Sequence, residues 1–142
     1  MKANVSWDGE MGFVADPPSG NRFVFDAHPD FGGKNKGPSP LETLLCALAA
    51  CTGMDVISIL HKKRQTVTAY RIEVEGERDP EGTWPRPFKR IVVRHILEGP
   101  DLDEAAVQRA IELSDEKYCS VSATLRFKPE IETEWRVLSQ SS

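Results

Sequence analysis

Two long segments in the middle of the chain alternate apolar and polar residues, as half-buried β-strands do. They run through residues 67–76 and 88–98, and a loop rich in proline and glycine separates them. The pattern therefore predicts an antiparallel pair of strands. Residues 131–137 alternate in the same way, and we expect them to form a strand that closes a sheet.

The N-terminal part of the chain carries shorter patterns of the same kind. Residues 5–7 and 12–14 flank Asp8-Gly9, a dipeptide typical of hairpin turns, and residues 22–26 alternate like a third strand. A glycine-rich, cationic loop follows at residues 32–38. It lacks both the lysine–serine pair of a P-loop and the dinucleotide-binding spacing, so we interpret it as a flexible connector rather than a phosphate cradle.

The clearest local signal is a helix start. Ser39 can cap the helix, Pro40 fits its first position, and Glu42 completes a capping box. The helix is predicted to run from about Pro40 to about Arg64. Residues 44–51 are apolar on all sides of the helix. Every face of such a helix has to be buried against other elements, and a small monomer has too few elements to do this.

The second half of the chain predicts two more helical segments. One runs through residues 101–113, and a break at Ser114-Asp115 leads to a short helix that begins around residues 118–122. Strands followed by a helix, twice over, are typical of an α+β fold. We expect a single domain spanning residues 1–142.

Composition and charge limit the functions that are open to the chain. With 39% hydrophobic and 28% charged residues it has the composition of a soluble globular protein. Its net charge of -4 provides no basic field, so we expect no nucleic-acid partner. The sequence contains no run of about 18 uncharged apolar residues, so it does not predict a membrane span. The N-terminus lacks the apolar run of a secretory signal, so we expect a cytoplasmic protein.

The cysteines are odd in number, and none belongs to a C-x-x-C pair. In a reducing compartment structural disulfides are rare, so these thiols are not explained as a disulfide framework. A zinc site usually has more closely spaced ligands, and the histidines are scattered; we therefore expect no metal and no cofactor. The residues concerned are Cys46, Cys51 and Cys119, and His28, His61 and His95.

Two of the cysteines are candidates for chemistry. Cys51 lies about three turns into the long helix, on one face with Leu48 and Asp55, and the simplest interpretation is a small core residue. Cys119 precedes the short helix, so its sulfur should face a helix N-terminus, which favours a thiolate. Cys46 lies about 140° around the helix from Cys51, among leucines and alanines, and is interpreted as packing.

If the fold brings Cys51 and Cys119 together, they form a redox couple. One thiolate attacks an O–O bond and becomes a sulfenic acid, and the other condenses with it to a disulfide. A cation should hold the first sulfur as a thiolate, and Arg22 is the first candidate, although a solvated strand arginine explains it equally well. Glu42 is a further candidate catalytic residue, although its place in the capping box already explains why a glutamate stands at the start of the helix.

The blocks around the two cysteines resemble the OsmC/Ohr family. One block covers residues 37–45 with Ala49-Ala50-Cys51, and the other covers residues 113–122 with Cys119. The similarity extends from about residue 3 to about residue 138. It implies an OsmC-like α+β fold in which antiparallel sheets wrap around the long central helices of an intertwined homodimer.

The resemblance also implies a function. Cys51 would attack an organic hydroperoxide or hydrogen peroxide, Cys119 would resolve the sulfenic acid, and a dithiol reductant would reset the pair in oxidative-stress defence. In the hydroperoxide reductases of the family a glutamate follows the proline directly, whereas here that position is Leu41 and the acid is Glu42. A dimeric small-ligand-binding or redox-sensing protein without peroxidase turnover is the alternative.

Overall fold

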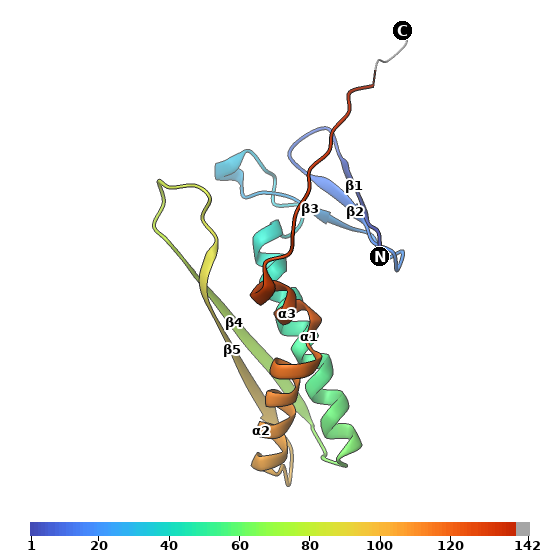
Figure 1. Cartoon of the computed structure of the whole chain (residues 1–142), viewed down its shortest axis with the longest axis vertical. Coiled ribbons are helices and arrows are strands. Elements are labelled where there is room, and N and C mark those ends of the chain that lie inside the picture. The colour runs from blue at the N-terminus through green and yellow to red at the C-terminus, as the bar shows by residue number, and fades with distance from the viewer. Residues whose placement is uncertain (139–142) are drawn as a thin grey trace.

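The N-terminal residues form a three-stranded antiparallel sheet at one end of the molecule (Figure 1). Its strands pair in chain order: β1 (Asn4–Trp7), β2 (Phe13–Asp16) and β3 (Phe23–Phe25). Gly9 in the first turn has a φ of 99°, a conformation that glycine adopts without strain. The hairpin expected around Asp8-Gly9 is therefore confirmed. The computed structural model describes residues 1–138.

A well-bonded loop connects this sheet to the first long helix. The buried Asp26 carboxylate accepts hydrogen bonds from the backbone N–H groups of Ala27, Lys34 and Lys36, and the loop includes the short helix η1 (Pro29–Phe31). These bonds lower the pKa of Asp26, because they stabilise the charged form. The loop is thus held in place by its own hydrogen bonds, which corrects its interpretation as a flexible connector.

The long helix α1 (Pro40–Lys62) begins where the sequence predicts. The Ser39 side chain accepts a hydrogen bond from the backbone N–H of Glu42 at 3.4 Å, and Pro40 occupies the first helical position. The helix ends two residues before the predicted Arg64, which adopts a positive φ of 56°.

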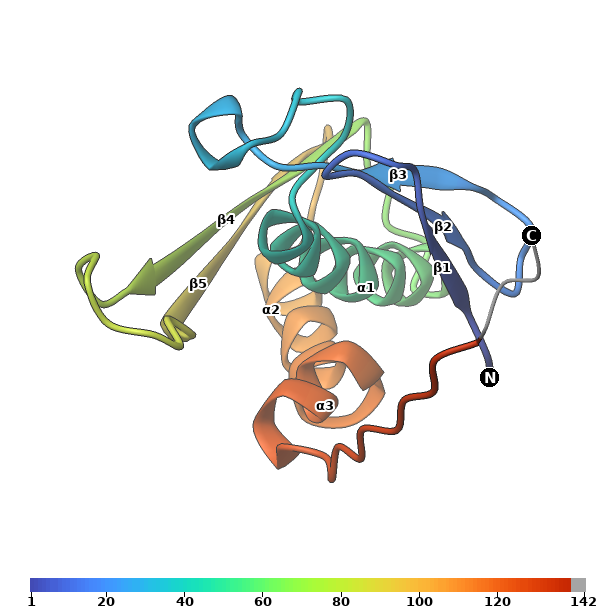
Figure 2. The ribbon, with the colours of Figure 1, turned by 90° about the horizontal axis from the view of Figure 1, so that it is seen from above.

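The strands β4 (Ala69–Arg78) and β5 (Phe88–Glu98) form a long antiparallel hairpin beside α1, as Figures 1 and 2 show. Their half-buried apolar positions alternate with exposed ones, so one face of the hairpin turns toward the helices. The helix α2 (Glu104–Leu113) lies against α1, and their shared core consists of Val56, Leu60 and Ala110.

The break expected at Ser114-Asp115 is a π-helical turn, η2 (Ser114–Tyr118), that continues directly from α2. It is followed by the short helix α3 (Ser120–Phe127), for which Cys119 is the N-cap residue. Figure 2 shows α2, η2 and α3 on one side of α1. Three helices and two antiparallel sheets in the described chain give the expected mixed α+β fold.

One expected strand is absent from the described residues. Residues 128–138 form no helix or strand, and Ile131, Trp135 and Val137 are each more than 80% exposed, at 83%, 85% and 84%. The prediction of a strand at 131–137 is wrong for the single chain, because no neighbouring strand pairs with this segment.

Much of α1 is uncovered in the single chain. The helix is long and apolar enough to cross a membrane by length and composition, and only 28% of its most apolar 18-residue stretch is buried. Core helices of soluble proteins share this length and composition, so the property alone does not indicate a membrane span. Met54 is 71% exposed and Ile57 41% exposed, and Cys46 within the all-round apolar stretch at 44–51 is exposed as well, so the single chain leaves part of this helix uncovered.

Candidate functional site

The structure brings the two predicted redox cysteines together. The sulfur atoms of Cys51 and Cys119 and a carboxylate oxygen of Asp55 all lie within 4.8 Å of one another. Cys119 is only 3% exposed, whereas Cys51 and Asp55 are half-buried. Residues 68 positions apart along the chain (119 − 51) therefore share one site.

Each donor is positioned by regular secondary structure. Cys51 and Asp55 are separated by one helical turn and lie on the same face of α1. Cys119 caps α3, and its Sγ accepts a hydrogen bond from the backbone N–H of Ser122 at 3.4 Å. The expectation that the Cys119 sulfur faces a helix N-terminus is confirmed.

A hydroxyl network joins the two halves of the site. Ser114, which is fully buried, donates a hydrogen bond to Oδ2 of Asp55 at 2.8 Å. Its oxygen lies 2.8 Å from Oγ1 of Thr52. Because the Ser114 proton is used toward Asp55, the Thr52 hydroxyl is the donor in this second bond. The network connects α1, which carries Cys51, to the turn that leads to Cys119.

The electrostatic surroundings favour a neutral Cys119. Burial raises the pKa of this thiol above its usual value, and the neighbouring Cys51 and Asp55 raise it further. The hydrogen bond from the Ser122 N–H acts in the opposite direction but does not outweigh burial. Cys119 is therefore a protonated thiol at neutral pH, which corrects the expectation that its place before a helix favours a thiolate; a protonated thiol suits a group that reacts second better than one that attacks first.

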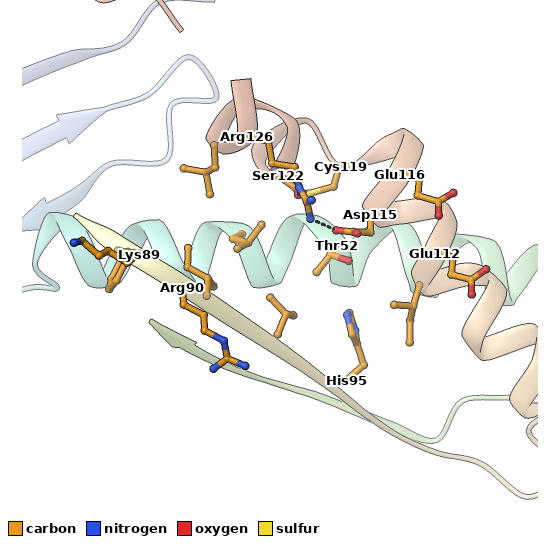
Figure 3. A pocket seen from close by; sticks show the side chains of 16 residues that line it. Thr52, Lys89, Arg90, His95, Glu112, Asp115, Glu116, Cys119, Ser122 and Arg126 are labelled. Carbon is orange, nitrogen blue, oxygen red and sulfur yellow. Dashed lines mark hydrogen bonds and ion pairs between the residues drawn. The ribbon is translucent and has the colours of Figure 1, made fainter. Parts of the chain in front are cut away.

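A cavity of about 670 Å³ opens beside Cys119, between β5, α2 and α3. Figure 3 shows Arg126 near Cys119 and Ser122, with His95 and Arg90 on the opposite wall. Arg126 donates from Nε to the Ser122 hydroxyl at 3.1 Å and pairs with Asp115 at 2.8 Å. The lining includes Cys119 but does not include Cys51.

The remaining predicted site residues lie elsewhere in the described chain. Arg22 is exposed and pairs with Asp16 on the N-terminal sheet at 3.3 Å. Glu42 is exposed and precedes Cys51 by nine residues, about 13 Å along α1 and on the opposite side of the helix. Neither belongs to the thiol cluster, so their catalytic roles stay predictions. Cys46, interpreted as a packing residue, is exposed in the single chain.

Three polar members of the site, Thr52, Asp55 and Ser114, were not predicted as site residues. The one-turn spacing of Cys51 and Asp55 was visible in the sequence, and it could have indicated that the carboxylate accompanies the thiol. Thr52 and Ser114 carry no such signal, because their contact joins positions 62 residues apart. Two thiols and a carboxylate at this separation can exchange protons, form a disulfide after a small movement, or hold a thiophilic cation.

Fold and site together define a small α+β protein that presents two thiols to each other beside a long central helix. The chain belongs to the OsmC-like protein family, whose model matches residues 33–134. It is 40% identical over 125 residues to the protein YhfA of Escherichia coli K12, covering 88% of this chain and 89% of YhfA.

Solved structures show the same fold. A hypothetical protein from Aquifex aeolicus VF5 is 30% identical, with a TM-score of 0.75 over 88% of this chain and 86% of that one. An organic hydroperoxide resistance protein OsmC from Legionella pneumophila is 14% identical, with a TM-score of 0.62 over 89% of this chain and 88% of that one. At this identity the second likeness concerns the fold alone.

Proposed function

We propose that this protein is a cysteine-based, non-haem peroxidase that reduces organic hydroperoxides or hydrogen peroxide in oxidative-stress defence. The observation that carries the proposal is the convergence of the Cys51 and Cys119 sulfurs within 4.8 Å. A disulfide requires the sulfurs to approach to about 2 Å, so the two cysteines must move closer when they are oxidised. A structure with the same fold is described as an organic hydroperoxide resistance protein; the chemistry proposed for this chain rests on its own two thiols.

The exposure of the thiols supports a division of roles. Cys51 is the half-buried thiol, and its thiolate attacks the terminal peroxide oxygen; the O–O bond breaks, and the alkoxide takes up a proton to leave as the alcohol. The buried Cys119 gives up its proton and attacks the Cys51 sulfenic acid, so the S–S bond forms and water leaves. A dithiol reductant then returns both residues to thiols by exchange.

The proposed active form is a cytoplasmic homodimer that requires neither a membrane nor a nucleic acid. Exposed apolar side chains on α1 and on residues 128–138 support a second copy of the chain as their cover. The negative net charge supports the absence of a nucleic-acid partner. In this assembly we propose that Arg22 and Glu42, which lie outside the thiol cluster of their own chain, act on the thiols across the subunit boundary.

The decisive experiment follows thiol loss in the chelator-treated, reduced protein on addition of one equivalent of cumene hydroperoxide. The wild type should lose two thiols per chain and turn over with a dithiol. Cys51→Ser should abolish peroxide consumption, and Cys119→Ser should stop at a single oxidised thiol. Cys46→Ser is the matched control, since this exposed cysteine lies outside the cluster. Undiminished turnover in Cys51→Ser would refute the proposal.

The cavity beside Cys119 favours one second candidate, a small-ligand-binding protein. Its volume of about 670 Å³ is in the range of sites for small molecules. A ligand that co-purifies in native mass spectrometry, together with thiols inert to peroxide, would favour binding. Rapid oxidation that no dithiol reverses would indicate redox sensing without turnover.

A further inference from the structure

We propose that the reduced protein binds a thiophilic divalent cation of the zinc type through Cys51, Asp55 and Cys119. The donor atoms of these residues lie within 4.8 Å of one another. The binding does not depend on peroxide turnover, because it uses only the reduced thiols and the carboxylate.

The donor set comes from two directions, as a metal site requires. Cys51 and Asp55 project from consecutive turns on one face of α1, and Cys119 approaches from the junction of η2 and α3. Zinc takes sulfur at about 2.3 Å and carboxylate oxygen at about 2.1 Å, which places tetrahedral donors roughly 3.5–3.8 Å apart. Donors no more than 4.8 Å apart therefore need to shift by about an ångström or less to close around the ion.

The identity of the donors selects the ion. Thiolates bind zinc and other soft cations, whereas magnesium and calcium require oxygen ligands. Three protein ligands leave a fourth tetrahedral position for water or another small ligand. Burial of Cys119 disfavours adventitious hydrated ions that keep their water shell.

The surrounding contacts preorganise the carboxylate. The Ser114 hydroxyl donates to Oδ2 of Asp55 at 2.8 Å, which fixes the orientation of the carboxylate while lone pairs remain for a ligand bond. Ser114 is in turn held by Thr52, as partners in the outer shell of metal sites hold the ligands themselves.

The charge balance also favours a cation. Once the thiols give up their protons, two thiolates and a carboxylate in one cluster repel one another, and a bound divalent ion offsets this repulsion. Cation binding displaces the two thiol protons, so affinity should increase with pH. An occupied site would also withdraw both sulfurs from oxidants.

The test is titration of the full-length, reduced, metal-free protein with Co²⁺ under anaerobic conditions. We expect one equivalent to bind per chain, with a sulfur-to-cobalt charge-transfer band and the visible bands of a tetrahedral site, and Zn²⁺ to displace it. Cys51→Ser and Cys119→Ser should each reduce the charge-transfer intensity by about half and the affinity at least ~10-fold. Asp55→Asn should weaken binding by at least ~10-fold while both thiols remain.

Cys46→Ser is the matched control and should bind Co²⁺ as the wild type does, since Cys46 is exposed and outside the cluster. Absence of the charge-transfer band in wild type, or unchanged affinity in both Cys51→Ser and Asp55→Asn, overturns the proposal. Because the buried Cys119 variant can fail to fold, the decision rests on the half-buried Cys51 and Asp55, with circular dichroism to verify folding. Peroxide reduction is measured on the metal-free protein, so either property can fail while the other stands.

Discussion

The hydroxyl of Ser114 lies 2.8 Å from the Asp55 carboxylate and fastens the turn that leads to one cysteine onto the helix that carries the other. The two residues are 59 positions apart, and Ser114 has no exposed surface. A buried hydroxyl stabilises a fold only while its hydrogen bonds are made. The spacing of the two thiols therefore depends on this contact.

Ser114→Ala should destabilise the protein by about 1–3 kcal/mol, because the buried Thr52 hydroxyl loses its acceptor and Asp55 loses its donor. The measurement is equilibrium urea unfolding, with the slope against denaturant checked for constancy. Ser120→Ala, at an exposed position nearby, is the control and should change stability by no more than about 0.5 kcal/mol. If Ser114→Ala changed the free energy of unfolding no more than Ser120→Ala, the hydroxyl network would contribute nothing to stability.

Asp55→Asn should lower the pKa of Cys119, because the charge of Asp55 contributes to raising it. Burial remains the larger cause, so the pKa should still lie above the usual thiol value. The measurement is the pH dependence of the Cys119 ¹³Cβ chemical shift, which separates this thiol from Cys46 and Cys51. Glu116→Gln, which removes a charge from an exposed residue of η2, should leave the titration unchanged. An unchanged or higher midpoint in Asp55→Asn contradicts the assignment.

Local chemistry made parts of the fold predictable, and long-range contacts made the rest unpredictable. Ser39 and Pro40 specify the start of α1 through neighbouring atoms, so the helix could be predicted to within two residues at its end. The strand expected at 131–137 had the right alternation, but a strand also needs a partner, and the described chain supplies none.

The site shows the same division. The helical spacing places Cys51 and Asp55 on one face of α1, whereas the approach of Cys119 depends on how α2 and η2 pack against that helix. The resemblance to a known family, rather than periodicity, joined the two cysteines in advance. Arg22 was predicted as the cation that a thiolate needs and Glu42 as a further candidate at the helix start, and within one chain neither belongs to the cluster.

The partial burial of Tyr70 and His95, which are hydrogen-bonded to each other, predicts a pH dependence of stability. The Tyr70 hydroxyl lies 2.6 Å from Nδ1 of His95, and burial lowers the pKa of His95 while raising that of Tyr70 to about 12. Asp115 raises the pKa of His95, but less than burial lowers it. An unfolded histidine takes up a proton near pH 6.5, so stability from His95 is present above about that pH and is lost as the pH falls below it.

The tyrosine acts at the other end of the scale. The unfolded phenol loses its proton near pH 10, so stability should fall as the pH rises from about 10 toward about 12. Urea unfolding at several pH values measures both effects. His95→Gln should flatten the acid limb and Tyr70→Phe the alkaline limb. If neither variant changes its limb, other groups carry the pH dependence.

The exposed side of α1 predicts the oligomeric state. Met54 is 71% exposed on a helix whose composition requires cover, so a second copy of the chain should bury it. Met54→Glu would then place an unpaired charge in an apolar interface, at a cost of several kcal/mol, and should convert a dimer to monomers at micromolar concentration.

Sedimentation equilibrium distinguishes the two states. Ala105→Glu adds the same charge at an exposed position in the first turn of α2, where the helix dipole favours an acid, and should remain dimeric. A monomeric wild type would remove the reason for expecting active sites at a subunit boundary, and a dimeric Met54→Glu would place the interface away from this face. Loss of peroxide reduction in Met54→Glu alone, with Cys51 and Cys119 intact, would indicate that the second chain contributes a group to the thiol site.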